Sequence, residues 1–214
     1  MPLVRVPRTL PRILPPQEAD RLVAALRTHR DRAMVLAMLL AGLIVGSEVL
    51  GLRFEDVQVA DRRLAVVEGK GGHHRVVPVA NRFFDALGGY LHDERPAAAR
   101  TDQVFVVLKG PRRGLPLSAE GLDEILDGAR RRAGLEHATC HRLRHTCLTR
   151  LREAGMALEA VQAQAGHASI ESTRVYLHLA NDWLADQYLR AAELIDADTA
   201  AVAEMLAVQE VAAR

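Results

Sequence analysis

The sequence predicts a mostly α-helical protein with a small antiparallel β-sheet, an α+β class. Apolar residues recur at helical spacing over most of the chain, whereas a central stretch contains short β-rich runs separated by turn residues. The 214 residues are enough for one domain with a substantial core. With 49% hydrophobic residues and a net charge of +1, the chain is also too apolar and too weakly charged to be disordered.

The N-terminal part is expected to contain an arm and three helices. Residues 1–12 are rich in proline and arginine and are expected to be a flexible basic arm. A helix is expected to start near Pro15, because proline is tolerated in a first turn. A second helix is expected from Asp31, since the apolar run Ala33–Val45 suits a buried core helix and is too short for a membrane span. Ser47–Leu52 predicts another short helix.

A small sheet is expected next. Three short runs rich in β-branched residues follow one another: Val57–Val59, Leu64–Val67 and Val76–Val79. Gly69 to Gly72 separates the second run from the third, which places Lys70 at the tip of a hairpin whose glycines permit positive φ.

The C-terminal half is expected to be largely helical. The expected helices are residues 81–95, a Ser118-capped helix ending at Gly134, and residues 140–154, 157–165, 170–179 and 182–196. Residues 103–107 are expected to form one more strand. We expect residues 13–190 to form a single domain and residues 191–214 to form a C-terminal amphipathic helix, a candidate contact between protomers.

The charge is distributed unevenly along the chain. Residues 1–152 carry 25 basic against 17 acidic side chains, and residues 153–214 carry 3 against 10. A basic body favours a polyanionic partner. The basic residues are 26 arginines and two lysines, Lys70 and Lys109, so Lys70 is a candidate for a role that needs an amine. Two cysteines and the lack of a signal-peptide pattern favour reduced thiols and a cytoplasmic location.

A candidate oxyanion site lies in the segment from His141 to His145. On a helix, His141, Arg144 and His145 share a face, and two imidazoles with a guanidinium suit a phosphate. A solvated polar surface is the plainer interpretation. Cys140 and Cys147 flank the imidazoles, but their spacing matches no standard zinc pattern, so neither a metal nor a cofactor is expected.

Four short sequence motifs occur one after another along the chain, and together they resemble those of a known protein family. The relevant segments are Gly69-Lys70-Gly71-Gly72, His141-Arg142-Leu143-Arg144-His145-Thr146, Gly166-His167 and Thr173-Arg174-Val175-Tyr176. Together they resemble the tyrosine recombinase (phage integrase) family over about residues 10–190. A lone tyrosine on a helix is usually a packing residue, and the order of the boxes is what favours a function for Tyr176.

The resemblance implies a set of roles at one phosphodiester. Tyr176 would attack the phosphorus and leave a 3′-phosphotyrosine, so neither ATP nor a metal is required. His141, Arg144 and His167 would hold the non-bridging oxygens, and Lys70 would protonate the leaving 5′-oxygen. The implied partners are double-stranded DNA and other recombinase protomers in a synaptic complex, with no membrane and no small-molecule substrate.

The chain departs from the family pattern in two places. The family carries its first catalytic arginine in a Gly-Leu-Arg-x-Ser/Gly-Glu box, but here the aligned residue is Ile44 or Val45 in a segment that is one residue longer. We therefore expect DNA binding with impaired cleavage. The pattern also begins near Leu10, so we expect no N-terminal DNA-binding domain of the kind that most relatives carry.

Other functions remain open on sequence grounds. A catalytically dead relative that only binds DNA would explain the missing arginine. A helix-turn-helix regulator would use residues 157–165 and 170–179, with Tyr176 in its core, but gives Lys70, His141 and Arg144 no role. Type IB topoisomerases share the chemistry, but the compact spacing of the boxes fits them less well.

Overall fold

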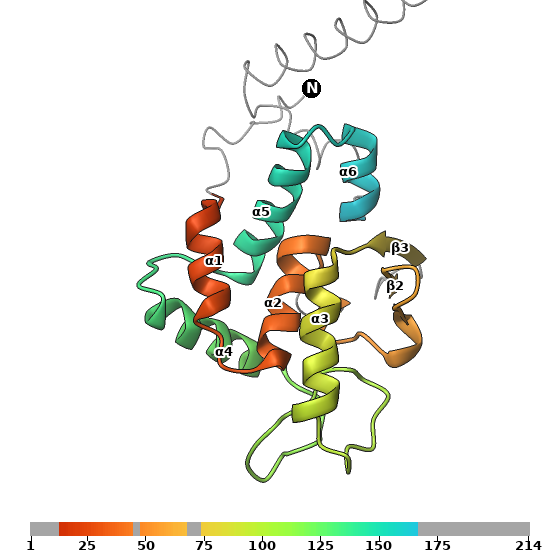
Figure 1. Ribbon diagram of the computed structural model, residues 1–214, viewed down its shortest axis with the longest axis vertical. Coiled ribbons are helices and arrows are strands. Elements are labelled where there is room, and N and C mark those ends of the chain that lie inside the picture. The colour runs from red at the N-terminus through yellow and green to blue at the C-terminus, as the bar shows by residue number, and fades with distance from the viewer. Residues whose placement is uncertain (1–12, 45–47, 68–73, 167–214) are drawn as a thin grey trace, which may run out of the picture.

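The computed structural model describes residues 13–44, 48–67 and 74–166. They form a helical body with a small sheet at one side (Figure 1). The helices are α1 (Pro16–Ala24), α2 (His29–Ala41), α3 (Asn81–Gly89), α4 (Ala119–Arg132), α5 (Cys140–Glu153) and α6 (Leu158–Ala165). A 3₁₀ turn, η2 (Phe54–Asp56), precedes the sheet, and a π-helical turn, η3 (Tyr90–Glu94), extends α3. The expected α+β class is therefore confirmed.

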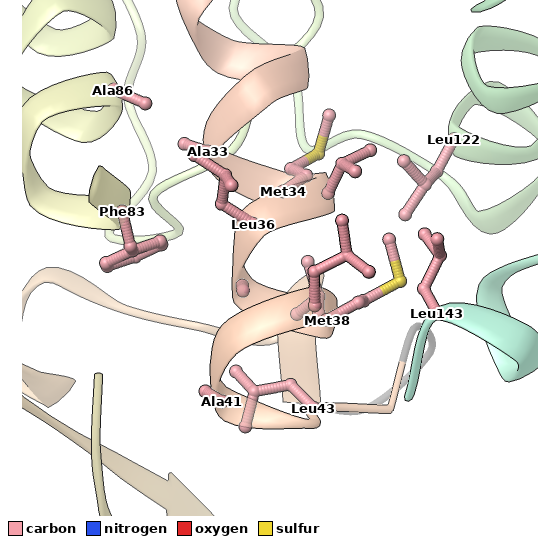
Figure 2. Close-up of a cluster of buried hydrophobic side chains, with 14 of the residues drawn as sticks. Ala33, Met34, Leu36, Met38, Ala41, Leu43, Phe83, Ala86, Leu122 and Leu143 are labelled. Atoms are coloured by element: carbon pink, nitrogen blue, oxygen red, sulfur yellow. The ribbon is translucent and has the colours of Figure 1, made fainter. Parts of the chain in front are cut away.

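Helix α2 is the centre of the core. Residues 33–38 are at most 4% exposed, which confirms a buried helix over the first part of the apolar run, but the helix ends at Ala41 and Ile44 is 46% exposed. Figure 2 shows Met34 and Met38 of α2 near Leu122 of α4 and Leu143 of α5, while Phe83 of α3 lies on the other side. Helix α2 contacts both α3 and α5, so it sets the position of α3 relative to α5. No helix in the described part of the chain is long and apolar enough to cross a membrane.

The expected hairpin is present. Strands β1 (Val57–Gln58), β2 (Arg63–Val67) and β3 (His74–Pro78) pair antiparallel in the order β1-β2-β3 within the described residues. Leu64 pairs with Val77, and both are buried, whereas Val76 is 52% exposed. One face of the hairpin therefore packs on the helices, as the period of two requires.

Two expected boundaries are wrong. Helix α2 begins at His29 rather than at Asp31, because Thr28 caps it and its Oγ1 accepts from the Asp31 N–H at 3.1 Å. The short helix expected at residues 47–52 is, over its described residues, a single wide turn at Glu48–Val49. The Val49 N–H reaches back five residues to the Ile44 carbonyl at 2.9 Å.

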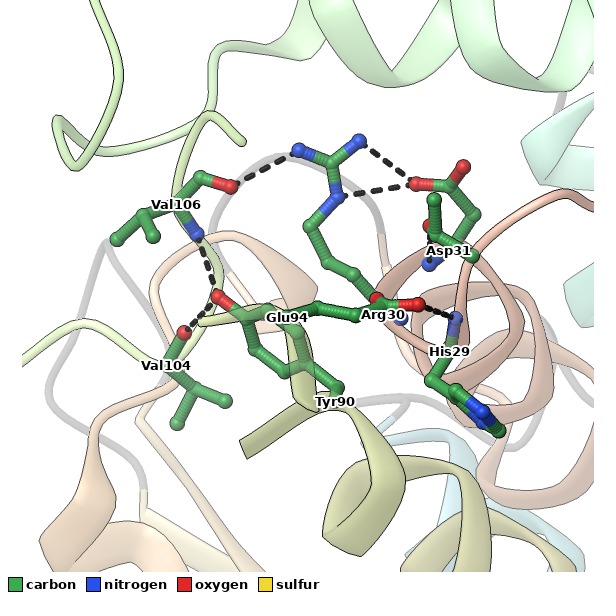
Figure 3. Close-up of polar contacts among 8 residues, drawn as sticks. His29, Arg30, Asp31, Tyr90, Glu94, Val104 and Val106 are labelled. Carbon is green, nitrogen blue, oxygen red and sulfur yellow. Dashed lines mark hydrogen bonds and ion pairs between the residues drawn. The ribbon is translucent and has the colours of Figure 1, made fainter. Parts of the chain in front are cut away.

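The strand expected at residues 103–107 is also absent. Gln103 and Val106 make only isolated bridges, to Arg53 and Pro116. The Val106 N–H is instead satisfied by the Tyr90 hydroxyl at 3.2 Å, which in turn donates to the Val104 carbonyl at 2.9 Å (Figure 3). The backbone hydrogen bonds of this buried segment go to the Tyr90 hydroxyl and to backbone groups of Leu52, Leu115 and Leu117, so they form no continuous ladder with one partner strand.

Candidate functional site

Arg144 is held between the C-terminal ends of two helices. Its side chain projects from α5, and the residue is only 8% exposed. Its Nη1 donates to the carbonyl of Gly42, the left-handed C-cap of α2, and its Nη2 donates to the carbonyl of Ala165, the last residue of α6, at 2.6 Å. Terminal helix carbonyls lack intrahelical partners and carry the negative end of the helix dipole. The guanidinium is therefore fixed in place, and the solvated-face interpretation is wrong for Arg144.

A buried carboxylate lies beside this guanidinium. Glu48 is 4% exposed, and its Oε2 accepts from the Ile44 N–H at 2.7 Å. The same oxygen lies 3.9 Å from Nη1 of Arg144. Arg75 on β3 contacts both carboxylate oxygens, with Nη1 2.8 Å from Oε1 and Nη2 2.9 Å from Oε2. Strand β3, the Ile44–Glu48 segment and α5 thus meet at one carboxylate.

Helix α6 completes this cluster. The Nε of Arg75 donates to the Gln164 carbonyl at 3.3 Å. The Gln164 side chain is buried, and its Nε2 donates to the Ala41 carbonyl at 3.0 Å and to the Pro78 carbonyl at 3.3 Å. Its contacts therefore join the last turn of α6 to the ends of α2 and β3. His167 follows two residues after Ala165 in the sequence.

Sequence reasoning did not identify Glu48, Arg75 or Gln164 as site residues. Glu48 had a signal, because a lone carboxylate between apolar segments is buried only when it is paired. Arg75 lies just before the expected run Val76–Val79 and is the second residue of β3 in the structure. Gln164 has no sequence signal that we can name.

The departure from the family box lies at the site itself. Ile44 is two residues after Gly42, whose carbonyl binds Arg144, and its own N–H binds Glu48. The Ile44 side chain is 46% exposed. An apolar, half-exposed side chain therefore stands at the first of the two positions that align with the arginine of the family box, two residues after the carbonyl that binds Arg144. Val45 lies outside the described residues.

His141 and His145 contact each other on α5. Their Nε2 atoms are 2.7 Å apart, and the rings meet edge to face with centroids 4.2 Å apart. A hydrogen bond at this distance needs one nitrogen as donor and the other as acceptor. His141 is exposed and His145 is half-buried, so the pair presents imidazole at the surface while Arg144 points inward.

Two of the five expected catalytic side chains lie in the described residues: His141 and Arg144 are one turn apart on α5, with His141 exposed and Arg144 buried. Lys70, His167 and Tyr176 lie outside the described residues. The strands that precede and follow Lys70 in sequence are paired, with Val67 opposite His74.

The two cysteines have unreactive environments. Burial, with Asp123 nearby, raises the pKa of Cys140 to about 12, and burial raises the pKa of Cys147 to about 12. Both are free thiols. Thiolate is the form that binds metals and attacks electrophiles. Among the described residues no group of three or more His, Cys, Asp or Glu side chains could hold a metal ion.

Comparison with known proteins identifies the family. The model of the phage integrase family matches residues 12–182. The chain belongs to the phage integrase family. A curated relative in this family, the tyrosine recombinase XerC of Corynebacterium efficiens, is 33% identical over 193 residues, which cover 87% of this chain and 60% of the relative. The tyrosine recombinase XerA of Thermococcus kodakarensis is 36% identical over 177 residues, 80% of this chain and 60% of the relative.

Solved structures of integrase-family proteins share the fold. The crystal structure of XerA recombinase superposes with a TM-score of 0.73 at 29% identity, covering 86% of this chain and 66% of that one. The catalytic domain of bacteriophage HP1 integrase gives a TM-score of 0.58 at 24% identity, covering 80% and 90%. The chain spans about 60% of the length of the curated relatives named above. Its fold matches 90% of the HP1 integrase catalytic domain.

Proposed function

We propose that this chain is the catalytic domain of a site-specific DNA recombinase that breaks and rejoins strands through a 3′-phosphotyrosine. The observation that carries the proposal is the buried Arg144, which two helix ends and Glu48 hold beside the box segment. Preorganised donors of this kind stabilise charge that develops on phosphate oxygens. Family membership supplies the reaction class.

The proposed chemistry uses five side chains. The Tyr176 oxygen forms a bond to phosphorus, and the bond from phosphorus to the 5′-oxygen breaks. Lys70 gives its proton to the departing 5′-oxygen. His141, Arg144 and His167 hold the non-bridging oxygens. A 5′-hydroxyl of a second strand then attacks the phosphotyrosine, which releases Tyr176 and restores a phosphodiester without metal or ATP.

The proposed partners are double-stranded DNA and further protomers of the recombinase. The basic body of residues 1–152 is suited to the DNA backbone. The segment 191–214 is proposed as a contact between protomers, and residues 1–12 as a basic arm. A DNA substrate and two reduced thiols are consistent with action in the cytoplasm.

We further propose that strand cleavage by this chain is slow. Ile44 offers no charge to the phosphate beside Arg144. Losing one preorganised donor costs about 10²- to 10³-fold in rate. A catalytically dead DNA-binding relative is the second candidate function, and the half-exposed Ile44 is the observation that favours it.

Covalent trapping tests the proposal. The chain is incubated with a pool of nicked duplexes whose central 30 bp are randomised, so that a broken strand diffuses away and the adduct accumulates. We expect a slow adduct that survives denaturation and is absent from Tyr176→Phe. DNA binding without any adduct, even over days, would establish the dead relative. An adduct that Tyr176→Phe still forms would overturn the assignment of the nucleophile.

A further inference from the structure

Among the described residues, two cations lie within 4.0 Å of the buried Glu48 carboxylate, and Arg75 is the one close enough to hydrogen-bond both of its oxygens. Arg75 Nη1 and Nη2 lie 2.8 and 2.9 Å from Oε1 and Oε2. Arg144 Nη1 lies 3.9 Å from Oε2, which is beyond hydrogen-bond length, and donates to the Gly42 carbonyl instead. Arg75 is therefore the principal counterion of Glu48.

Because the Glu48 carboxylate is buried, its ion pair with Arg75 matters for the charge of the site. The Glu48 side chain is 1% exposed, so water cannot neutralise the carboxylate, and a protein cation must do so. With Ile44 in the box, Arg75 and Arg144 are the cations found within 4.0 Å of it among the described residues. Within the described part of the chain, charge that Arg75 does not balance falls on Arg144.

We propose that Arg75 is a positioning residue that occupies Glu48 and so preserves the positive charge of Arg144 for the scissile phosphate. This inference rests on the proposed function. Without Arg75, the carboxylate becomes the counterion of Arg144, and a phosphate must compete with it. Arg75 acts through Glu48 and needs no contact with DNA.

The proposal predicts that substituting Glu48 restores the DNA binding that is lost when Arg75 is substituted. Arg75, Glu48 and Arg144 carry a combined charge of +1. Arg75→Gln lowers it to zero, and Glu48→Gln raises it to +2. The double variant returns to +1, with Arg144 as the remaining cation. If charge on Arg144 governs phosphate binding, the second substitution rescues the first. If the Arg75–Glu48 pair only stabilises the fold, the second substitution does not rescue it.

A matched control exists at the opposite end of α2. Arg30 donates from Nε and Nη2 to Asp31 Oδ1 at 2.9 and 2.7 Å, and both side chains are under 10% exposed (Figure 3). Arg30 lies 11 residues, or about 16 Å of helix, from Ala41 at the end that faces the site. Substituting Arg30→Gln, Asp31→Asn and both removes a buried ion pair of the same kind without altering the charge near Arg144.

The experiment measures DNA affinity and adduct formation for all variants. Fluorescence anisotropy with a labelled random-sequence 30-bp duplex gives Kd as a function of KCl concentration, and nicked duplexes give the rate of trapping. Folding is checked for each variant by urea titration. We expect Arg75→Gln to slow trapping by about tenfold or more and to reduce the slope of log Kd against log salt by about 0.9, one phosphate contact. The double variant should return to within about threefold of the parent chain.

The outcomes separate this inference from the proposed function. A parent chain that binds DNA, with a double variant no better than Arg75→Gln, overturns the role of Arg75 alone. Equal losses in the Arg30–Asp31 series would do the same, since they would indicate a general effect of losing a buried ion pair. A parent chain that neither binds DNA nor is trapped overturns both proposals. If the parent chain binds DNA but forms no adduct, the slope of log Kd against log salt tests the role of Arg75: a slope reduced in Arg75→Gln and restored in the double variant supports it, and an unchanged slope overturns it.

Discussion

An arginine at residue 44 is expected to accelerate DNA cleavage by this chain. The backbone of residue 44 is fixed on both sides, since its N–H donates to Glu48 at 2.7 Å and its carbonyl accepts from the Val49 N–H at 2.9 Å. Two residues earlier, the Gly42 carbonyl binds Arg144. The backbone from which an arginine side chain at residue 44 would extend is therefore fixed, two residues from the carbonyl that binds the Arg144 guanidinium.

The energy terms favour a net gain. The Ile44 side chain is already 46% exposed, so replacing it costs about 1 kcal/mol of apolar burial. At about 4 Å and an effective dielectric of 20, attraction to Glu48 and repulsion from Arg144 are each about 4 kcal/mol and offset each other, whereas repulsion from Arg75 is left as a cost to the free chain that the negative charge of a bound phosphate offsets. One added phosphate donor contributes about 2.7–4 kcal/mol to the transition state, which corresponds to about 10²- to 10³-fold in rate.

Single-turnover trapping on nicked duplexes measures the effect. Ile44→Arg is compared with the same change combined with deletion of Gly46, which returns the box to the family length. Leu91→Arg is the control, because it adds the same charge at a 37% exposed apolar position on η3. A parent chain that already cleaves as fast as Ile44→Arg, or an equal gain from Leu91→Arg, would refute the reasoning about the box.

Three further changes test the packing around the site. Gly42→Ala should lower the free energy of unfolding by about 1–2 kcal/mol in urea titration, because Gly42 has φ +68° and an added Cβ would lie 3.2 Å from a buried leucine side chain. Tyr90→Phe should cost about 1–3 kcal/mol in the same assay, because the buried Val106 N–H loses its acceptor. Cys147 should resist iodoacetamide at pH 8 in the folded protein and react in urea, because burial raises its pKa to about 12. The same shift removes stability as pH rises from the unfolded value of about 9 toward 12, since only the unfolded thiol ionises readily there.

Local patterns predicted the elements that support the site. The apolar run predicted α2, and short runs rich in β-branched residues predicted the paired strands β2 and β3. Ser118 predicted the start of α4, where its Oγ accepts from the Gly121 N–H at 3.2 Å. Each depends on residues within a few positions of one another. The failed strand at residues 103–107 shows the limit, because β-branched residues favour any half-buried extended segment, whether or not a partner strand is present.

The polar contacts of the site were not predictable in the same way. Arg75 and Glu48 are 27 residues apart, and Arg144 and Gly42 are 102 residues apart. Nothing in the local sequence states which carbonyl or carboxylate a buried arginine will meet. The resemblance supplied Arg144 and His141 by position, but it could not supply the groups that fix them. Those groups appear only when α2, α5, α6 and β3 are assembled.

Gln164 tests whether assembly of these elements controls the site. Its amide donates to the Ala41 and Pro78 carbonyls, and the next residue, Ala165, supplies the carbonyl that binds Arg144. Gln164→Leu keeps the approximate volume but leaves both carbonyls without this donor, which should lower the free energy of unfolding by about 1–3 kcal/mol. If α6 positions Arg144, trapping should slow further than the loss of folded protein explains, and Ile44→Arg should recover less activity in this background. Full recovery would mean that Arg144 is held sufficiently by α2 and Glu48, and that α6 is only packed against them.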